Sequence, residues 1–253
     1  MPLTRFILTG ALLTALGCSV IVPSGPSNVA QGRYYSSGDP DYDDFFLKVY
    51  RLQIKLKDAP PRVGEPRQKV ADALGVGPDP SDIRGALAKR ASELKERGVR
   101  YTIGRPPSPD KPPSLLVTGN PTGKDFELKG FLEGALKGAG ELKVDLTAWQ
   151  KELDELSARE STLEGNLAEA FANRSESQRT EVKNNLADAQ KIISLLGERT
   201  HDLDVATTDF LKALTTALGE TQVEAAPSES VADDSGTHEV RDKKGKKPAP
   251  EKP

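Results

Sequence analysis

The chain of 253 residues contains a single cysteine, Cys18, so no disulfide can form within it and its stability must come from packing. Aromatic residues are also scarce, at 5% of the chain, whereas 29% of the residues are charged. Because β-strands favour aromatic and β-branched side chains, this composition argues against a β-rich fold. It is typical of a helical protein with a polar surface.

Histidine is nearly absent as well, with His201 and His238 as the two examples. Neither has the spacing of a metal-binding pair, and no Gly-x-Ser-x-Gly nucleophile motif occurs. We therefore expect no catalytic residues, no metal, no cofactor and no enzymatic activity. One alternative stays open, an envelope hydrolase, which would need a pocket that gathers Asp, Glu or Ser side chains around His201.

The acidic stretch "DPDYDD" places Asp39, Asp41 and Asp43 at alternate positions, as at the start of an EF-hand calcium loop. That loop needs glycine at its sixth position and glutamate at its twelfth, where this chain has Asp44 and Tyr50. We interpret the cluster instead as acidic capping of a helix, because a helix N-terminus favours negative charge.

The N-terminal segment combines Arg5 with an uncharged apolar run over residues 6–17. A run of about a dozen residues is too short to cross a bilayer, which takes about 20 residues in a helix. A basic start, a short apolar run and small residues at its end are typical of a secretory signal.

This run ends in Ala15-Leu16-Gly17-Cys18, which resembles the lipobox of bacterial lipoproteins. The resemblance implies cleavage before Cys18, removal of residues 1–17, and a mature chain whose first residue carries lipid on its sulfur and its amino group. Ser19 follows, and the lack of Asp there is similar to outer-membrane sorting. The expected location is therefore the cell envelope, lipid-anchored and facing the periplasm from the outer membrane. The alternative is an ordinary secretory signal that happens to contain a cysteine.

Residues 18–40 are rich in Ser, Gly and Pro, which favours a flexible tether. A helical pattern then runs from Tyr42 to Leu56 and ends at Pro60-Pro61; further helices are expected around 70–74 and from Ser81. Residues 100–104 and 114–119 are strand candidates, separated by "RPPSPDKPPS". This proline-rich segment is either a hairpin connection or a loop that recognises a partner.

The strongest pattern is a pair of heptad runs, over residues 142–170 and 182–214, with a polar break between them. They predict an antiparallel helical hairpin with a left-handed seam. Counting outward from the turn places Glu160 near Ile193 and Leu153 near Thr200. We interpret Glu160 as a polar interruption of the seam.

Just before the first heptad run, Gly130, Gly134 and Gly138 lie four residues apart on one helical stripe. We expect them to pack closely onto the N-terminal helices, with a hinge or a docking groove as the alternative.

Residues 219–253 combine many charges and prolines with few apolar side chains, which predicts a disordered tail. Its last part, 239–253, has six basic against three acidic side chains, although the whole chain has a net charge of −3. The tail either keeps the protein soluble or contacts anionic lipid head groups. An acidic, exported body makes nucleic acid an unfavourable partner.

Together these patterns predict an all-α protein: a helical bundle over residues 41–218 with a long antiparallel coiled-coil-like hairpin at about 125–218. A small β-hairpin is inserted at about 100–119, and a disordered tail follows. The expected partners are membrane lipid, through acylated Cys18, and a protein partner or a second copy, through the hairpin. The expected role is structural or interaction work; a regulatory binding module of an envelope enzyme or transport complex is the alternative, and it would expose a second apolar stripe on the hairpin.

Overall fold

The computed structural model describes residues 26–105, 108 and 111–222. This part is mainly helical, as predicted, with five helices and three short strands. In chain order the elements are α1 (Pro40–Lys57), α2 (Pro60–Leu74), α3 (Pro80–Glu96), β1 (Arg100–Arg105), β2 (Ser114–Thr118), α4 (Lys124–Ala170), α5 (Glu176–Leu218) and β3 (Glu220–Gln222).

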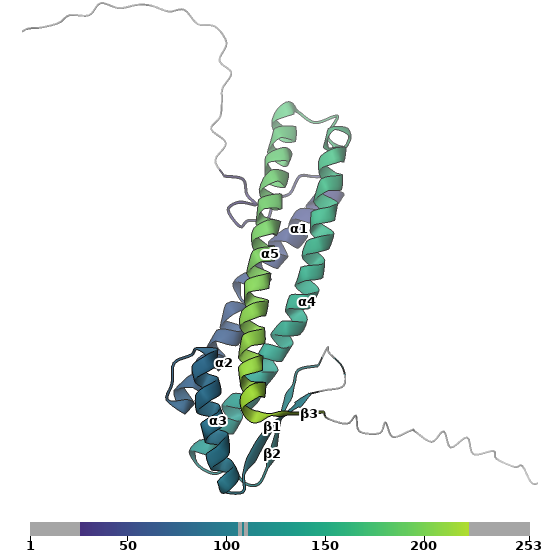
Figure 1. The fold of residues 1–253 in the computed structure, drawn as a ribbon. Coiled ribbons are helices and arrows are strands. Elements are labelled where there is room, and N and C mark those ends of the chain that lie inside the picture. Colours follow the sequence, from purple (N-terminus) through teal and green to yellow (C-terminus); the bar gives the residue numbers. More distant parts are fainter. Residues whose placement is uncertain (1–25, 106–107, 109–110, 223–253) are drawn as a thin grey trace, which may run out of the picture.

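The antiparallel pair α4–α5 runs the length of the molecule, as the heptad runs predicted (Figure 1). Helices of 47 and 43 residues are about 70 and 65 Å long at 1.5 Å per residue. Ser175 begins α5 with a capping box in which its side chain and that of Gln178 bond each other's backbone N–H groups. Lys143 of α4 bonds Asp204 and Thr208 of α5, which ties the two antiparallel helices together.

The other helices cover this pair from one end to the other. α1 packs against both long helices, α2 packs mainly on α4, and α3 packs mainly on α5. α1 begins at Asp39, whose side chain accepts from the N–H groups of Asp41 and Tyr42. Its apolar face inserts into the common core through six side chains: Tyr42, Phe45, Phe46, Val49, Leu52 and Leu56.

Proline has a second role in this region besides the one expected. The first helix, α1, ends at Lys57, before Pro60-Pro61, as expected, and Pro60 also begins α2, where a missing N–H group costs nothing. α2 is therefore longer than the short helix expected around residues 70–74. Likewise α3 begins at the cap Asp79, to which Ser81 donates, rather than at Ser81 itself.

The predicted β-hairpin is present, with β1 and β2 antiparallel and Arg100 opposite Thr118. A third strand was not predicted: β3 pairs parallel with β1, so the sheet order is β2-β1-β3. The prediction that the tail begins at residue 219 was wrong for residues 220–222, because backbone pairing and an Arg105–Glu220 ion pair at 2.7 Å hold them. Residues 223–253 lie outside the described part.

The tether prediction was also wrong for the residues of it that the structure describes, 26–40. Val29 and Tyr35 are 3% and 6% exposed and belong to the main core. The Tyr35 ring packs edge-on against Phe46 with ring centres 5.1 Å apart, and the Val29 N–H donates to the Asn185 side chain of α5. The folded body therefore includes this segment, although its Ser- and Gly-rich composition is typical of a flexible linker.

Candidate binding grooves along the helical hairpin

The acidic segment before α1 caps that helix, as expected. Asp39 is the N-cap, and Asp43 accepts hydrogen bonds from the backbone and side chain of Ser37 and from Ser36. These bonds outweigh the effect of burial and lower the pKa of Asp43. Asp39 and Asp43 are thus each bound to donors within the same segment.

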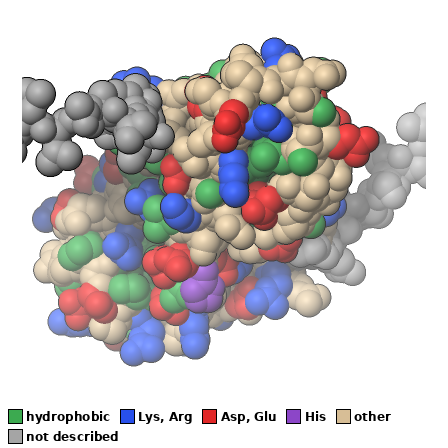
Figure 2. All heavy atoms as spheres, turned by 90° about the horizontal axis from the view of Figure 1, so that it is seen from above, with side chains coloured by type: hydrophobic (Ala, Val, Ile, Leu, Met, Phe, Trp, Pro, Cys, Tyr) green, Lys and Arg blue, Asp and Glu red, His purple; other side chains and the backbone are tan. Residues whose placement is uncertain are grey.

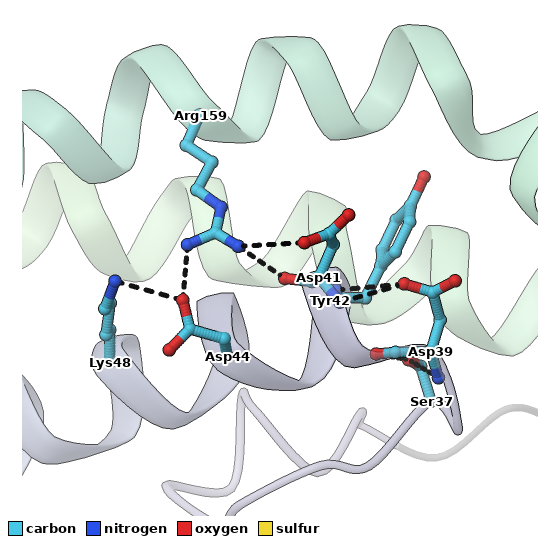
Figure 3. Close-up of polar contacts among 7 residues, drawn as sticks. All are labelled: Ser37, Asp39, Asp41, Tyr42, Asp44, Lys48 and Arg159. Atoms are coloured by element: carbon cyan, nitrogen blue, oxygen red, sulfur yellow. Dashed lines mark hydrogen bonds and ion pairs between the residues drawn. The ribbon is translucent and has the colours of Figure 1, made fainter.

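Two further carboxylates of this segment tie α1 to the hairpin. Arg159 reaches from α4 across to Asp44 and to the side chain and carbonyl of Asp41, and Lys48 also bonds Asp44 (Figure 3). Hydrogen bonds from Arg159 and Lys48 lower the pKa of Asp44. The hydroxyl of Tyr42 adds a bond to the Leu163 carbonyl at 2.6 Å. This cluster positions α1 against α4.

Glu160 lies in the seam between α4 and α5, as predicted, and is only 3% exposed. It makes no hydrogen bond or ion pair with any residue in the described part of the chain, unlike its neighbour Arg159. Burial, reinforced by the nearby charge of Glu164, raises the pKa of its carboxyl. The buried side-chain atoms without a hydrogen-bond partner in the described residues are Arg67 Nε and Arg179 Nε, so the carboxyl oxygens of Glu160 keep some access to solvent between the two longest helices.

A groove of about 610 Å³ lies beside this carboxyl. Glu160 and buried Ile193 line its inner part, which confirms that the two lie close together, and Ser157, Gln190 and Ser194 form an exposed rim. Lys191 also lines the groove, with its ammonium bound to Asp188 at 2.9 Å. The groove combines a buried acid with hydroxyl and amide groups.

A second groove, of about 530 Å³, lies farther along the same helices and contains His201. Asp204 in this groove pairs with Lys143 at 2.6 Å. The hydroxyls of Thr147 and Thr200 bond the carbonyls one turn back in their own helices, so neither is oriented by the histidine. His201 itself is exposed and makes no hydrogen bond within the described residues. The hydrolase alternative thus has a groove but no oriented nucleophile and base within it.

An ionic cluster around a buried carboxylate, which the sequence patterns did not indicate, lies at the other end of the molecule. The Asp125 side chain, 5% exposed, bonds Arg90 of α3 at 2.6 Å and Arg97, the C-cap of α3, at 2.8 Å. The hydroxyl of Tyr101, from β1, donates to the Asp125 carbonyl at 2.7 Å. Because its members come from three elements, no local spacing in the sequence could have revealed it.

The glycine stripe is largely exposed, contrary to the expectation of close packing. A Cβ atom added at Gly130 or Gly134 would meet nothing within 4 Å, whereas one at Gly138 would lie 3.3 Å from the Arg62 carbonyl of α2. Among the glycines of α4 the closest approach is at Gly140, outside the stripe, where a Cβ would lie 2.5 Å from the Pro112 side chain. The proline-rich connection therefore packs on α4 at Gly140.

The surface of the hairpin is mixed in charge. Figure 2 views the molecule from one end of the long helices; on this end face, Lys and Arg side chains are interspersed with Asp and Glu, and hydrophobic side chains form small separate groups. The large hydrophobic side chains exposed on the two long helices are Phe126, Phe131, Leu195 and Val205. Their spacing gives no continuous second apolar stripe within residues 124–218.

Cys18, the leader before it, His238 and the basic tail lie outside the described residues. Within residues 26–105, 108 and 111–222, no helix has the length and apolar character to cross a membrane. Over the same residues no cluster of three or more His, Cys, Asp or Glu is arranged to hold a metal ion.

The fold and its grooves define a helical-hairpin protein with a small three-stranded sheet at one end. In comparisons with known proteins, no family model, no curated protein and no solved structure matches the chain.

Proposed function

We propose that this chain is a lipid-anchored protein of the bacterial cell envelope, facing the periplasm from the outer membrane, with a structural or protein-interaction role. The observation that carries the proposal is the position of the single cysteine. It stands directly after the apolar run, in Ala15-Leu16-Gly17-Cys18. Acyl chains on Cys18 would anchor the protein stably, since two or three chains bind far more strongly than one.

The described body supports a role close to the membrane surface. Residues 19–25 separate Cys18 from the first described residue, and seven extended residues span at most about 25 Å. Because Val29 and Tyr35 belong to the core, the connection is shorter than the tether expected from composition. The body would therefore stay near the lipid, with little freedom to move away.

The α4–α5 pair is the surface proposed to contact a protein partner or a second copy of the chain. It is long, its exposed side is polar and mixed in charge, and it has two grooves. Such a surface suits a polar interface more than the apolar docking expected of a regulatory binding module.

Membrane fractionation and crosslinking test the two halves of this proposal. In the native host, the wild-type protein is expected in the outer-membrane fraction, and Cys18→Ala in the soluble fraction or retained with its leader. Crosslinking with a reagent that joins lysine side chains, here those of α4 and α5, is expected to yield one defined adduct, either a dimer or a heteromeric complex. Wild-type protein that is released from membranes by carbonate contradicts the anchor, and the absence of any defined adduct contradicts the interaction role.

A further inference from the structure

The Glu160 groove combines a buried acid with unused polar groups. The side chains of Ser157, Gln190 and Ser194 form its exposed rim and make no hydrogen bonds with other described residues. The Glu160 side chain is only 3% exposed and has no hydrogen-bond or ion-pair partner among the described residues, and its oxygens are not fully buried, so what remains accessible of them lies in the groove that Glu160 lines. Lys191 also lines the groove, but its ammonium is bound to Asp188. The groove therefore offers acceptors that no described donor occupies.

We propose that this groove is a binding site for a primary ammonium group. An ammonium carries one positive charge and three N–H donors. Glu160 supplies the opposite charge, and the hydroxyl and amide oxygens of the rim can accept the remaining donors. A guanidinium prefers a bidentate, planar arrangement, and a divalent cation requires several carboxylates or carbonyls, whereas the groove has one buried carboxyl group.

The chain itself contains one source of this group. The segment 239–253 contains Lys243, Lys244, Lys246, Lys247 and Lys252. From Gln222 to Lys243 an extended chain spans about 70 Å, and the groove, level with Ile193, lies about 40 Å along α5 from Leu218. A tail lysine can therefore reach the site, and a free amine or the lysine of another molecule is the second source.

Titration with n-butylammonium chloride at constant ionic strength tests the site directly. The backbone amide signals of Ser157 and Ser194 in the NMR spectrum of the purified, full-length chain are the readout. We expect a saturable shift at millimolar ligand, and no saturable shift with tetramethylammonium, which has the charge but no N–H donors. Equal effects of the two cations would overturn the proposal, because they would indicate charge screening alone.

Matched variants assign the binding to the buried carboxyl. Glu160→Gln keeps the shape and removes the charge, and is expected to weaken butylammonium binding at least tenfold. Glu164→Gln changes an exposed acid one turn away and is expected to leave the affinity within twofold. Ser157→Ala, which disturbs the seam less than a change at Glu160, is expected to weaken binding several-fold. Unchanged affinity in both Glu160→Gln and Ser157→Ala would contradict the site.

A full-length variant with the five tail lysines changed to glutamine distinguishes the two sources. If the tail occupies the groove, this variant shifts the Ser157 and Ser194 amides without ligand and binds butylammonium several-fold more tightly than wild type. If the ammonium comes from elsewhere, both chains bind with equal affinity. Failure of both chains to show saturable binding overturns the proposal. The result does not depend on lipid at Cys18, so it can fail or succeed independently of the proposed anchor.

Discussion

At the scale of single residues, Glu160 is the side chain whose chemistry departs most from that of a structural seam. Its neighbours in the seam are apolar or, like Thr200, bond their own helix, since the Thr200 hydroxyl donates to the Leu196 carbonyl. Glu160 has no hydrogen-bond partner among the described residues. A heptad position occupied by a polar residue often fixes register at a cost in stability.

We predict that Glu160→Gln stabilises the fold at pH 7, by about 1 kcal/mol, because a buried neutral amide costs less than a buried charge. Since burial raises the pKa of Glu160, the folded state holds this proton more tightly than the unfolded state does. Its contribution to stability is therefore fully present below pH 4.5, the ordinary pKa, and is lost as the pH rises through the raised value.

Urea denaturation of wild type and Glu160→Gln at several pH values measures this difference. The stability gap should widen as the pH rises from 4 and level off above the raised pKa of Glu160. The carboxylates with lowered pKa values, among them Asp43 and Asp44, act in the opposite direction and at lower pH, and they cancel in the comparison. A gap that is constant over this range would show that Glu160 is solvated in the folded protein.

Tyr35 tests whether residues 26–40 belong to the core. Tyr35→Ala removes a ring packed against Phe46 and should cost about 3 kcal/mol of unfolding free energy. The adjacent Tyr34 is 42% exposed, so Tyr34→Ala should cost less than about 1 kcal/mol. Thermal or chemical unfolding followed by circular dichroism measures both, and equal small losses would mean that the segment is a tether after all.

Asp125 is buried, unlike the acidic side chains on the surface. Asp125→Ala removes a buried acceptor of two charge-assisted hydrogen bonds, from Arg90 and Arg97, and should destabilise the protein by about 2 kcal/mol. The control is Asp145→Ala, which breaks a 2.6 Å pair with Arg62 whose side chains are 44% and 35% exposed, and should cost no more than about 1 kcal/mol. Comparable losses in the two variants, measured by urea denaturation, would contradict a dominant role for the ionic cluster around Asp125.

At the scale of elements, some glycines are required for close packing and others are not, and α4 contains both kinds. Gly140 allows the connection between β1 and β2 to lie against the helix, because an added Cβ would collide with Pro112. Gly119, at the end of β2, has φ +87°, and a Cβ there would collide with the Gly98 carbonyl. In contrast Gly130 and Gly134 face open space.

We therefore predict opposite signs for two glycine substitutions in one helix. Gly140→Ala should destabilise the protein by about 1–2 kcal/mol, since displacing the prolines outweighs the gain in helix propensity. Gly130→Ala should stabilise it by up to about 1 kcal/mol, because it gains propensity and meets no neighbour. Melting temperatures of the two variants decide this, and stabilisation by Gly140→Ala would mean that the proline segment does not rest on α4.

The elements also show where sequence patterns are sufficient. The helical hairpin was predictable because its heptads extend over many turns, so the period is unambiguous and the polar break marks the turn. β3 was not predictable from the sequence, because its residues Glu220–Gln222 are polar. Backbone pairing to β1, which is distant in the sequence, holds them in place. Residues 26–40 were misinterpreted because two buried side chains, Val29 and Tyr35, are outnumbered by residues typical of a linker.

The candidate site was predictable only in part for the same reason. The heptad position of Glu160 indicated burial in the seam. The rim of the groove did not stand out, because Ser157, Gln190 and Ser194 look like ordinary exposed positions in a helix. Their relation to Glu160 depends on how the two helices align, and the sequence pattern predicts that alignment only to within about one turn.

At the scale of the whole molecule, one core joins the N-terminal segment, the three shorter helices, the sheet and most of the hairpin. A body of this kind moves as a unit on its anchor, and the short connection to Cys18 would keep one side of it near the membrane. The proposed interaction surface, the α4–α5 pair, extends about 65–70 Å from end to end. The proposed anchor, the fold of the body and the proposed ammonium site can therefore be tested separately.

The central claim, a lipid-anchored envelope protein, is tested most directly by the intact mass of the protein purified from its native membrane. We predict the mass of residues 18–253 plus a diacylglyceryl group and an N-linked acyl chain, with the modification mapped to Cys18, and no such species from Cys18→Ala. An unmodified chain, whether it retains residues 1–17 or is cut at another position, would contradict the claim.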